Sequence, residues 1–156
     1  MKKQVELGDV FEIKTNKGYA YLQCVDIPEN NNEVELIKVF YDLHKEHLLI
    51  ISDVIKSDFF YIRFPLKAAN KRKIVSKIFN TPLSDDFEIP IYFRTENMFN
   101  EGWQIVDSRT LHRKSVTELT YEQKKMSPWG GMNDTKIIEL LEKGWRLENW
   151  TIENGW

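Results

Sequence analysis

Short segments with the pattern of β-strands follow one another through the first half of the sequence, and the stretches between them are too short for crossover helices. Residues 10–15 alternate apolar and polar side chains, Asn16-Lys17-Gly18 suits a tight turn, and residues 19–27 continue the β pattern. Parallel neighbours need connections of about a dozen residues or more, whereas antiparallel neighbours need only a turn. The first half therefore predicts an antiparallel sheet.

Further β-prone stretches extend this sheet. They are residues 34–41, 47–54, 59–64, 74–79, 90–94 and 102–113, and the short apolar run at 74–79 also fits a helix. Several short strands at close spacing favour a strongly bent antiparallel sheet or a small SH3-like barrel. Between them, residues 66–70 predict one helical turn, and the stretch from Pro82 to Pro90 predicts a surface loop, because neither a helix interior nor a central strand accommodates it.

Two helices are predicted in the last third of the chain. Thr120 and Gln123 have the spacing of a capping box for a short helix over residues 121–126. Residues 134–143 carry apolar side chains at helical spacing, with Asn133 placed as the N-cap and Gly144 as the residue after the last turn. We therefore predict an α+β fold, one domain over residues 1–156, with this C-terminal helix packed on the sheet.

Charge and cysteine content restrict the partners and the compartment. The chain has 22 Lys and Arg against 24 Asp and Glu, a net charge of −2, which gives no global attraction to nucleic acid or to an anionic membrane. Cys24 is the only cysteine, which excludes an internal disulfide and a thiolate zinc site. No apolar stretch has the length of a signal peptide or a membrane span. We expect a cytoplasmic protein without a membrane partner.

Two short motifs partly match patterns of metal or nucleotide binding. His44 and His47 would lie on one face of a helix, but a third ligand and the His-Glu-x-x-His pattern are missing, which favours a polar loop. Gly130-Gly131 precedes a helix without the Gly-Lys-Ser/Thr of a phosphate loop, which favours a turn. We expect neither a metal nor a cofactor.

Residues 107–118 carry the side-chain types that a metal-independent ribonuclease uses for proton transfer and phosphate stabilisation. These are Arg109, His112, Arg113 and Glu118. A strand would place Arg109 and Arg113 on one face and His112 on the other. We predict no enzymatic activity and keep a ribonuclease as the alternative.

A charge contrast suggests a protein partner. Residues 63–77 hold basic side chains and no acid, which leaves a nucleic-acid-binding module open as another alternative. The loop after them carries Asp85, Asp86 and Glu88, which we predict to complement a basic cleft. Trp150 and Trp156 have no evident place in the core and are predicted as interface anchors, or as part of a tail that lies over the sheet as an edge strand.

Three stretches resemble the immunity protein 26 family of bacterial polymorphic toxin systems. The first is Gly8-Asp9-Val10-Phe11-Glu12-Ile13 with Tyr19-Ala20-Tyr21-Leu22-Gln23, the second is Phe64-Pro65-Leu66 with Ala68-Ala69, and the third is Asn133-Asp134-Thr135 leading to Gly144-Trp145. The resemblance implies a cytoplasmic immunity protein that binds and neutralises a cognate protein toxin and has no catalytic role. It assigns no toxin-contacting residues.

Overall fold

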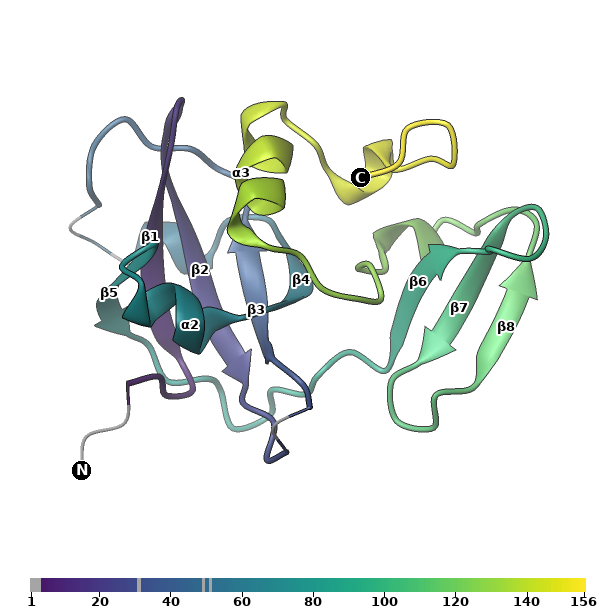
Figure 1. The fold of residues 1–156 in the computed structure, drawn as a ribbon, viewed down its shortest axis with the longest axis horizontal. Helices are drawn as coiled ribbons and strands as arrows, with labels where there is room; N and C mark the ends of the chain where they lie inside the picture. The colour runs from purple at the N-terminus through teal and green to yellow at the C-terminus, as the bar shows by residue number, and fades with distance from the viewer. Residues whose placement is uncertain (1–3, 31, 49, 51) are drawn as a thin grey trace.

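The computed structural model of the chain describes residues 4–30, 32–48, 50 and 52–156. It confirms the predicted α+β fold, with strands in two antiparallel sheets and a helix near the C-terminus (Figure 1). The strands are β1 (Asp9–Thr15), β2 (Gly18–Asp26), β3 (Glu35–Phe40), β4 (Phe59–Phe64), β5 (Val75–Asn80), β6 (Tyr92–Glu96), β7 (Trp103–Asp107) and β8 (Arg113–Val116). The helices are α1 (Ser52–Ile55), α2 (Leu66–Lys71), α3 (Asp134–Glu142) and the short 3-10 turns η1 (Gln123–Lys125) and η2 (Leu147–Asn149).

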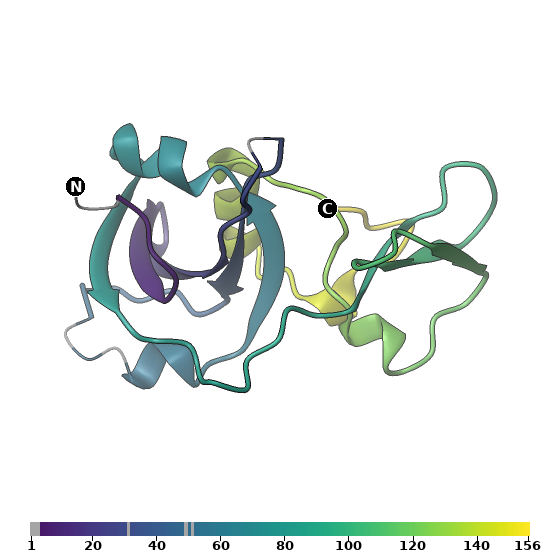
Figure 2. The ribbon, with the colours of Figure 1, turned by 90° about the horizontal axis from the view of Figure 1, so that it is seen from below.

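The larger sheet has five strands in the order β4-β3-β2-β1-β5. The predicted turn at Asn16-Lys17 joins β1 to β2, with Thr15 opposite Gly18. Helix α2 then carries the chain from one edge strand, β4, to the other, β5, which pairs with β1. Figure 2 shows that the sheet curls strongly around its own interior, as the spacing of the strands predicts.

The smaller sheet, β6-β7-β8, lies beside the first and was not predicted as a separate unit. Residues 102–113 were predicted as one strand, which is wrong, because the chain turns after Asp107. The Asp107 carboxylate accepts hydrogen bonds from Arg109 N and Thr110 N at 2.8 and 3.1 Å, and Leu111 adopts a φ of 64°. This side-chain-to-backbone bonding makes a turn where an uninterrupted strand was expected.

The prediction of a strand over residues 47–54 is also wrong for the part of that range that the structure describes. Leu48 N donates to the hydroxyl of Tyr21 instead of a neighbouring strand, and α1 begins at Ser52 with Val54 buried. Residues 49 and 51 lie outside the described residues. A short apolar run is compatible with either a strand or a helix, and in this segment a short helix forms.

Helix α3 packs on the larger sheet, and its ends match the prediction. The Asn133 side chain accepts a hydrogen bond from Lys136 N at 2.8 Å, and Gly144 takes a φ of 72° after the last turn. The β1–β2 turn holds the other end, because Lys17 Nζ donates to the Glu142 carbonyl at 2.8 Å. The capping box is present too, since Thr120 and Gln123 exchange hydrogen bonds of 2.9 and 3.2 Å.

A connecting segment, residues 127–132, joins the two sheets. Toward the smaller sheet, Arg94 N donates to Ser127 O and Trp129 N donates to Arg94 O, at 3.0 and 2.8 Å. Toward the larger sheet, Arg63 N donates to Gly130 O and Met132 N donates to Arg63 O, at 3.2 and 2.9 Å. Gly130-Gly131 therefore lies in a backbone bridge between the sheets, where a turn was predicted.

Position 8 allows a prediction about the turn that leads into β1. Gly8 has a φ of 87°, and a Cβ there would lie 2.4 Å from the Thr81 carbonyl oxygen, which is closer than a carbon can approach. We expect Gly8→Ala to lower the free energy of unfolding by about 2 kcal/mol, from backbone strain and this clash. Urea denaturation measures the change. The control is Gly155→Ala, with a nearest approach of 3.5 Å, and equal midpoints for both variants would contradict the prediction.

Candidate partner-binding surface

The acidic loop, residues 82–90, connects the two sheets and is held down by its apolar side chains. Leu83, Phe87 and Ile89 pack on a buried cluster formed by Val25, Leu36 and Phe93. Lys38 Nζ lies 5.6 Å from the ring centroid of Phe87, and burial lowers the pKa of this lysine. A backbone hydrogen bond of 3.0 Å from Phe87 N to Ser84 O closes the turn between them. The loop is therefore packed in place along its length.

The three predicted carboxylates of this loop face solvent. Asp85, Asp86 and Glu88 are all exposed. Glu88 lies 4.0 Å from an Arg109 nitrogen, and both side chains are exposed, so the pair contributes little to stability. Asp85 and Asp86 take part in no ion pair within the described part of the chain. Their charges are thus available to an incoming partner.

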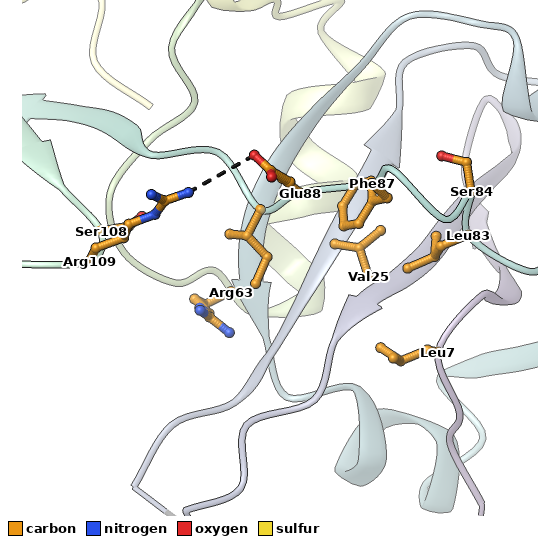
Figure 3. A pocket seen from close by; sticks show the side chains of 10 residues that line it. Leu7, Val25, Arg63, Leu83, Ser84, Phe87, Glu88, Ser108 and Arg109 are labelled. Carbon is orange, nitrogen blue, oxygen red and sulfur yellow. Dashed lines mark ion pairs between the residues drawn. The ribbon is translucent and has the colours of Figure 1, made fainter.

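A pocket of about 600 Å³ lies beside the acidic loop (Figure 3). Its apolar lining comes from the loop, from β2 and from Leu7 before β1, and its charged lining comes from Arg63, Glu88 and Arg109. A second pocket of about 440 Å³ shares Arg63 and Ser108 with the first and continues to Trp129. Together they form a hollow that is lined by residues of both sheets and has both apolar and charged side chains in its lining.

Two basic side chains of residues 63–77 form ion pairs with carboxylates of the same chain. Arg63 Nη1 lies 2.9 Å from the Asp26 carboxylate and also donates to the Val34 carbonyl at 3.1 Å. Lys77 Nζ lies 2.9 Å from the Asp9 carboxylate, which is itself buried. The remaining basic side chains of the stretch are exposed along α2 and just after it, at Lys67, Lys71, Arg72 and Lys73. They form a basic patch on α2.

The residues of the ribonuclease alternative do not come together. Arg109 lines the pocket beside the acidic loop, whereas His112 lines another pocket, of about 340 Å³, with Lys114. Glu118 lines a third, of about 330 Å³, near the C-terminal tail. Arg113 reaches across to Gln104, donating to its side-chain oxygen at 2.9 Å. A shared substrate would therefore have to reach three separate pockets at once.

The two histidines of the 44–47 motif pack on tyrosines. His47 Nδ1 lies 2.7 Å from a Glu12 carboxylate oxygen, and its ring centroid is 4.1 Å from that of Tyr19. His44 meets the ring of Tyr21 edge-on at 5.6 Å. Within residues 4–30, 32–48, 50 and 52–156, no group of three or more His, Cys, Asp or Glu is placed to hold a metal ion.

Two other features bear on chemistry and location. Burial raises the pKa of the Cys24 thiol to about 12, so it stays protonated at neutral pH and is a poor nucleophile. No helix in the described part of the chain is both long enough and apolar enough to cross a membrane.

The tail differs from the prediction at Trp150. This side chain is only 4% exposed and belongs to the main core, so the expectation that it lies outside the core is wrong. Its ring meets that of Trp103 edge-on at 4.9 Å, and the tail forms η2 instead of an edge strand. Trp156 is half-buried against Trp150 at 6.3 Å and keeps part of its ring at the surface. A buried Trp150 offers a partner almost no contact area.

The exposed carboxylates of this surface were predicted from the sequence, but the packing that holds their loop in place was not. The signal was present in Leu83, Phe87 and Ile89, whose apolar side chains interrupt an otherwise polar loop. Such side chains in a loop indicate that it packs on something. The place of Arg63 and Ser108 in both pockets depends on the meeting of two sheets, which no local pattern predicts.

No protein-family model, curated protein or solved structure matches this chain. The resemblance to the immunity protein 26 family therefore stays a prediction.

Proposed function

We propose that this chain is a cytoplasmic immunity protein that binds a cognate bacterial toxin and blocks it by direct contact. The resemblance in three stretches motivates the class of function. The observation that carries the proposal here is the acidic loop, because packed apolar residues hold it in place while Asp85 and Asp86 stay exposed and outside the ion pairs formed among the described residues. A loop of this kind loses little conformational freedom on binding.

The charge of this loop fits one kind of target. Enzymes that act on nucleic acid bind their substrate through basic side chains that neutralise phosphates. A carboxylate-bearing loop can occupy such a cleft, and charge complementarity accelerates the encounter. The adjoining hollow gives room for an apolar side chain of the toxin. We thus infer that the toxin presents a basic surface to the acidic loop.

The first experiment asks whether protection occurs at all. The reading frames next to the one encoding this chain are searched for a large secreted protein with a toxic C-terminal domain, which is then co-expressed with this chain. We expect survival and a complex that forms at micromolar concentration or below. Equal killing with and without this chain, together with no complex, would overturn the proposal.

Charge reversal then tests the loop. Changing Asp85, Asp86 and Glu88 together to lysine should weaken the complex at least tenfold, about 1.4 kcal/mol, because favourable charge pairs become repulsive. Calorimetric titration of the purified complex measures the change. The matched control reverses three other exposed acids, Glu29, Asp42 and Glu46, and should leave the affinity unchanged. If the two triple variants bind alike, the toxin docks on another face.

A second candidate, a nucleic-acid-binding module, is favoured by the basic patch on α2. Its four basic side chains are exposed and lie outside the ion pairs found among the described residues. Binding through such a patch weakens steeply as salt increases, because phosphate contacts release counterions. RNA titrations at two salt concentrations separate the candidates. Cleavage of the RNA that disappears with His112→Ala would instead support the ribonuclease alternative.

A further inference from the structure

The loop between β6 and β7 exposes two large apolar side chains at its end. We call residues 97–102 the hairpin tip. Met98 is 90% exposed and Phe99 is 87% exposed, the highest values among the large apolar residues of the described chain. Isolated apolar side chains at a surface need no explanation, but two adjacent ones at the end of a hairpin form a protruding apolar point.

The backbone holds the hairpin tip in one conformation. Asn97 N donates to Gly102 O at 3.0 Å, which closes the loop. The Asn97 side-chain oxygen accepts from Phe99 N and Asn100 N, at 3.0 and 3.2 Å, and its amide nitrogen donates to Ser115 Oγ on β8 at 3.2 Å. Gly102 has a φ of 94°, and a Cβ there would lie 2.3 Å from the Val116 carbonyl oxygen. The tip is therefore organised before any partner arrives.

The segments that meet at the hairpin-tip end of the smaller sheet carry acidic side chains. The segments 95–104, 115–119 and 147–156 meet at this end of the smaller sheet: Trp103 pairs with Val116, and Gly155 approaches the Glu96 carboxylate. Together these segments contain five carboxylates and no lysine or arginine: Glu96, Glu101, Glu118, Glu148 and Glu153. Lys124, from η1, lines a pocket with Glu118, Glu148 and Glu153. We call this region the acidic end.

We propose that the hairpin tip is a second docking point, whose occupant is a protein with an apolar pocket bordered by basic side chains. Phe99 and Met98 would fill the pocket, and the carboxylates of the acidic end would pair with its basic border. The same carboxylates disfavour an anionic membrane, which needs basic residues beside the apolar point. They also disfavour tip-to-tip contact between two copies, because like charges would meet.

This inference goes beyond toxin binding by the acidic loop. The hairpin tip lies at the start of β7, whereas Arg109 and the acidic loop lie near its other end, so the two surfaces face opposite ends of the smaller sheet (Figure 1). One large partner could reach both, or two partners could bind separately. The variants that test the acidic loop do not alter the tip, so either proposal can fail alone.

Site-specific photo-crosslinking in the cells that produce the chain tests the proposal. The photoreactive residue p-benzoylphenylalanine replaces Phe99 in the full chain, and the control carries it at Lys14, an exposed position on β1. We expect a protein adduct at position 99 that is absent at position 14. Changing Glu101 and Glu118 to lysine should reduce its yield at least tenfold, while changing Asp42 and Glu46 should not.

Every other result overturns the proposal. An adduct that forms equally at position 14, that ignores the reversal of Glu101 and Glu118, or that never forms shows that the tip has no basic-bordered partner. An adduct at twice the mass of the chain identifies a second copy as the occupant. Flotation of the unmodified protein with vesicles of equal parts phosphatidylcholine and phosphatidylglycerol, lost in Phe99→Ser, identifies a membrane.

Discussion

Replacing Arg94 by methionine is expected to lower the free energy of unfolding by about 4 kcal/mol or more. Arg94 is fully buried in the smaller sheet, and its guanidinium donates to four backbone carbonyls. The acceptors belong to Lys124, Met126, Leu147 and Trp150, at 3.0, 3.2, 2.7 and 3.4 Å. The bonds to Leu147 and Trp150 are buried, and each buried carbonyl left without a donor costs about 1–3 kcal/mol.

The guanidinium also packs against two indole rings. Its central carbon is 4.7 Å from the ring centroid of Trp103 and 4.3 Å from that of Trp150. Burial lowers the pKa of Arg94 to about 10, so the side chain remains charged at neutral pH. Carbonyl dipoles and indole faces stabilise this charge, since none of the ion pairs among the described residues includes Arg94.

Two control variants define the Arg94 test. Arg113→Met removes an exposed arginine of the same sheet and should change stability by less than about 0.5 kcal/mol. Arg94→Lys keeps the charge but cannot span four acceptors with a planar group, so most of the loss should remain. Chemical denaturation followed by tryptophan fluorescence reports all three. An Arg94→Met midpoint equal to that of Arg113→Met would show that the four bonds contribute nothing.

Trp150→Ala is expected to lower the free energy of unfolding by about 3–5 kcal/mol, the cost of deleting a large buried aromatic side chain. Trp150 lies between Trp103 and Trp145, and it covers the guanidinium of Arg94. Its loss would open a cavity where the tail meets both sheets. Thermal unfolding monitored by circular dichroism measures the effect.

Trp156→Ala is the matched comparison for Trp150→Ala. Trp156 is only half-buried, so its removal should cost clearly less stability than the removal of Trp150. If toxin protection is established, Trp150→Ala should weaken it only where the variant unfolds. Weaker toxin binding by a fully folded Trp150→Ala protein would instead show that this residue contacts the toxin.

Features set by neighbouring residues could be predicted from the sequence. The β1–β2 hairpin, the Asn133 cap, Gly144 and the exchange between Thr120 and Gln123 all depend on side chains a few residues apart. The carboxylates of the acidic loop were also identified, because proline bounds the loop and its polar residues predict exposure. The antiparallel arrangement followed from connections too short for the crossover helices that parallel strands need.

Features that join distant parts of the chain could not be predicted. Arg94 looked like one base among acids, and nothing near it in sequence indicates the carbonyls more than 25 residues away that it binds. No place in the core was predicted for Trp150, because the rings that bury it belong to Trp103 and Trp145. The exposure of Met98 and Phe99 could not be predicted from the sequence either, since apolar residues beside a strand predict burial.

The four carbonyls bound by Arg94 have a consequence for how the protein is made. Two of the acceptors, at residues 147 and 150, are synthesised more than 50 residues after Arg94 itself. The five-stranded sheet has all its strands once residue 80 has emerged from the ribosome, and strands of one unit can fold while synthesis continues. In the smaller sheet, in contrast, Arg94 lacks two of its four carbonyl acceptors and the covering ring of Trp150 until the tail arrives. Until the tail is made, the nascent chain exposes the indole of Trp103. A chaperone or an early-bound partner would therefore have the largest apolar surface to cover at this stage of synthesis.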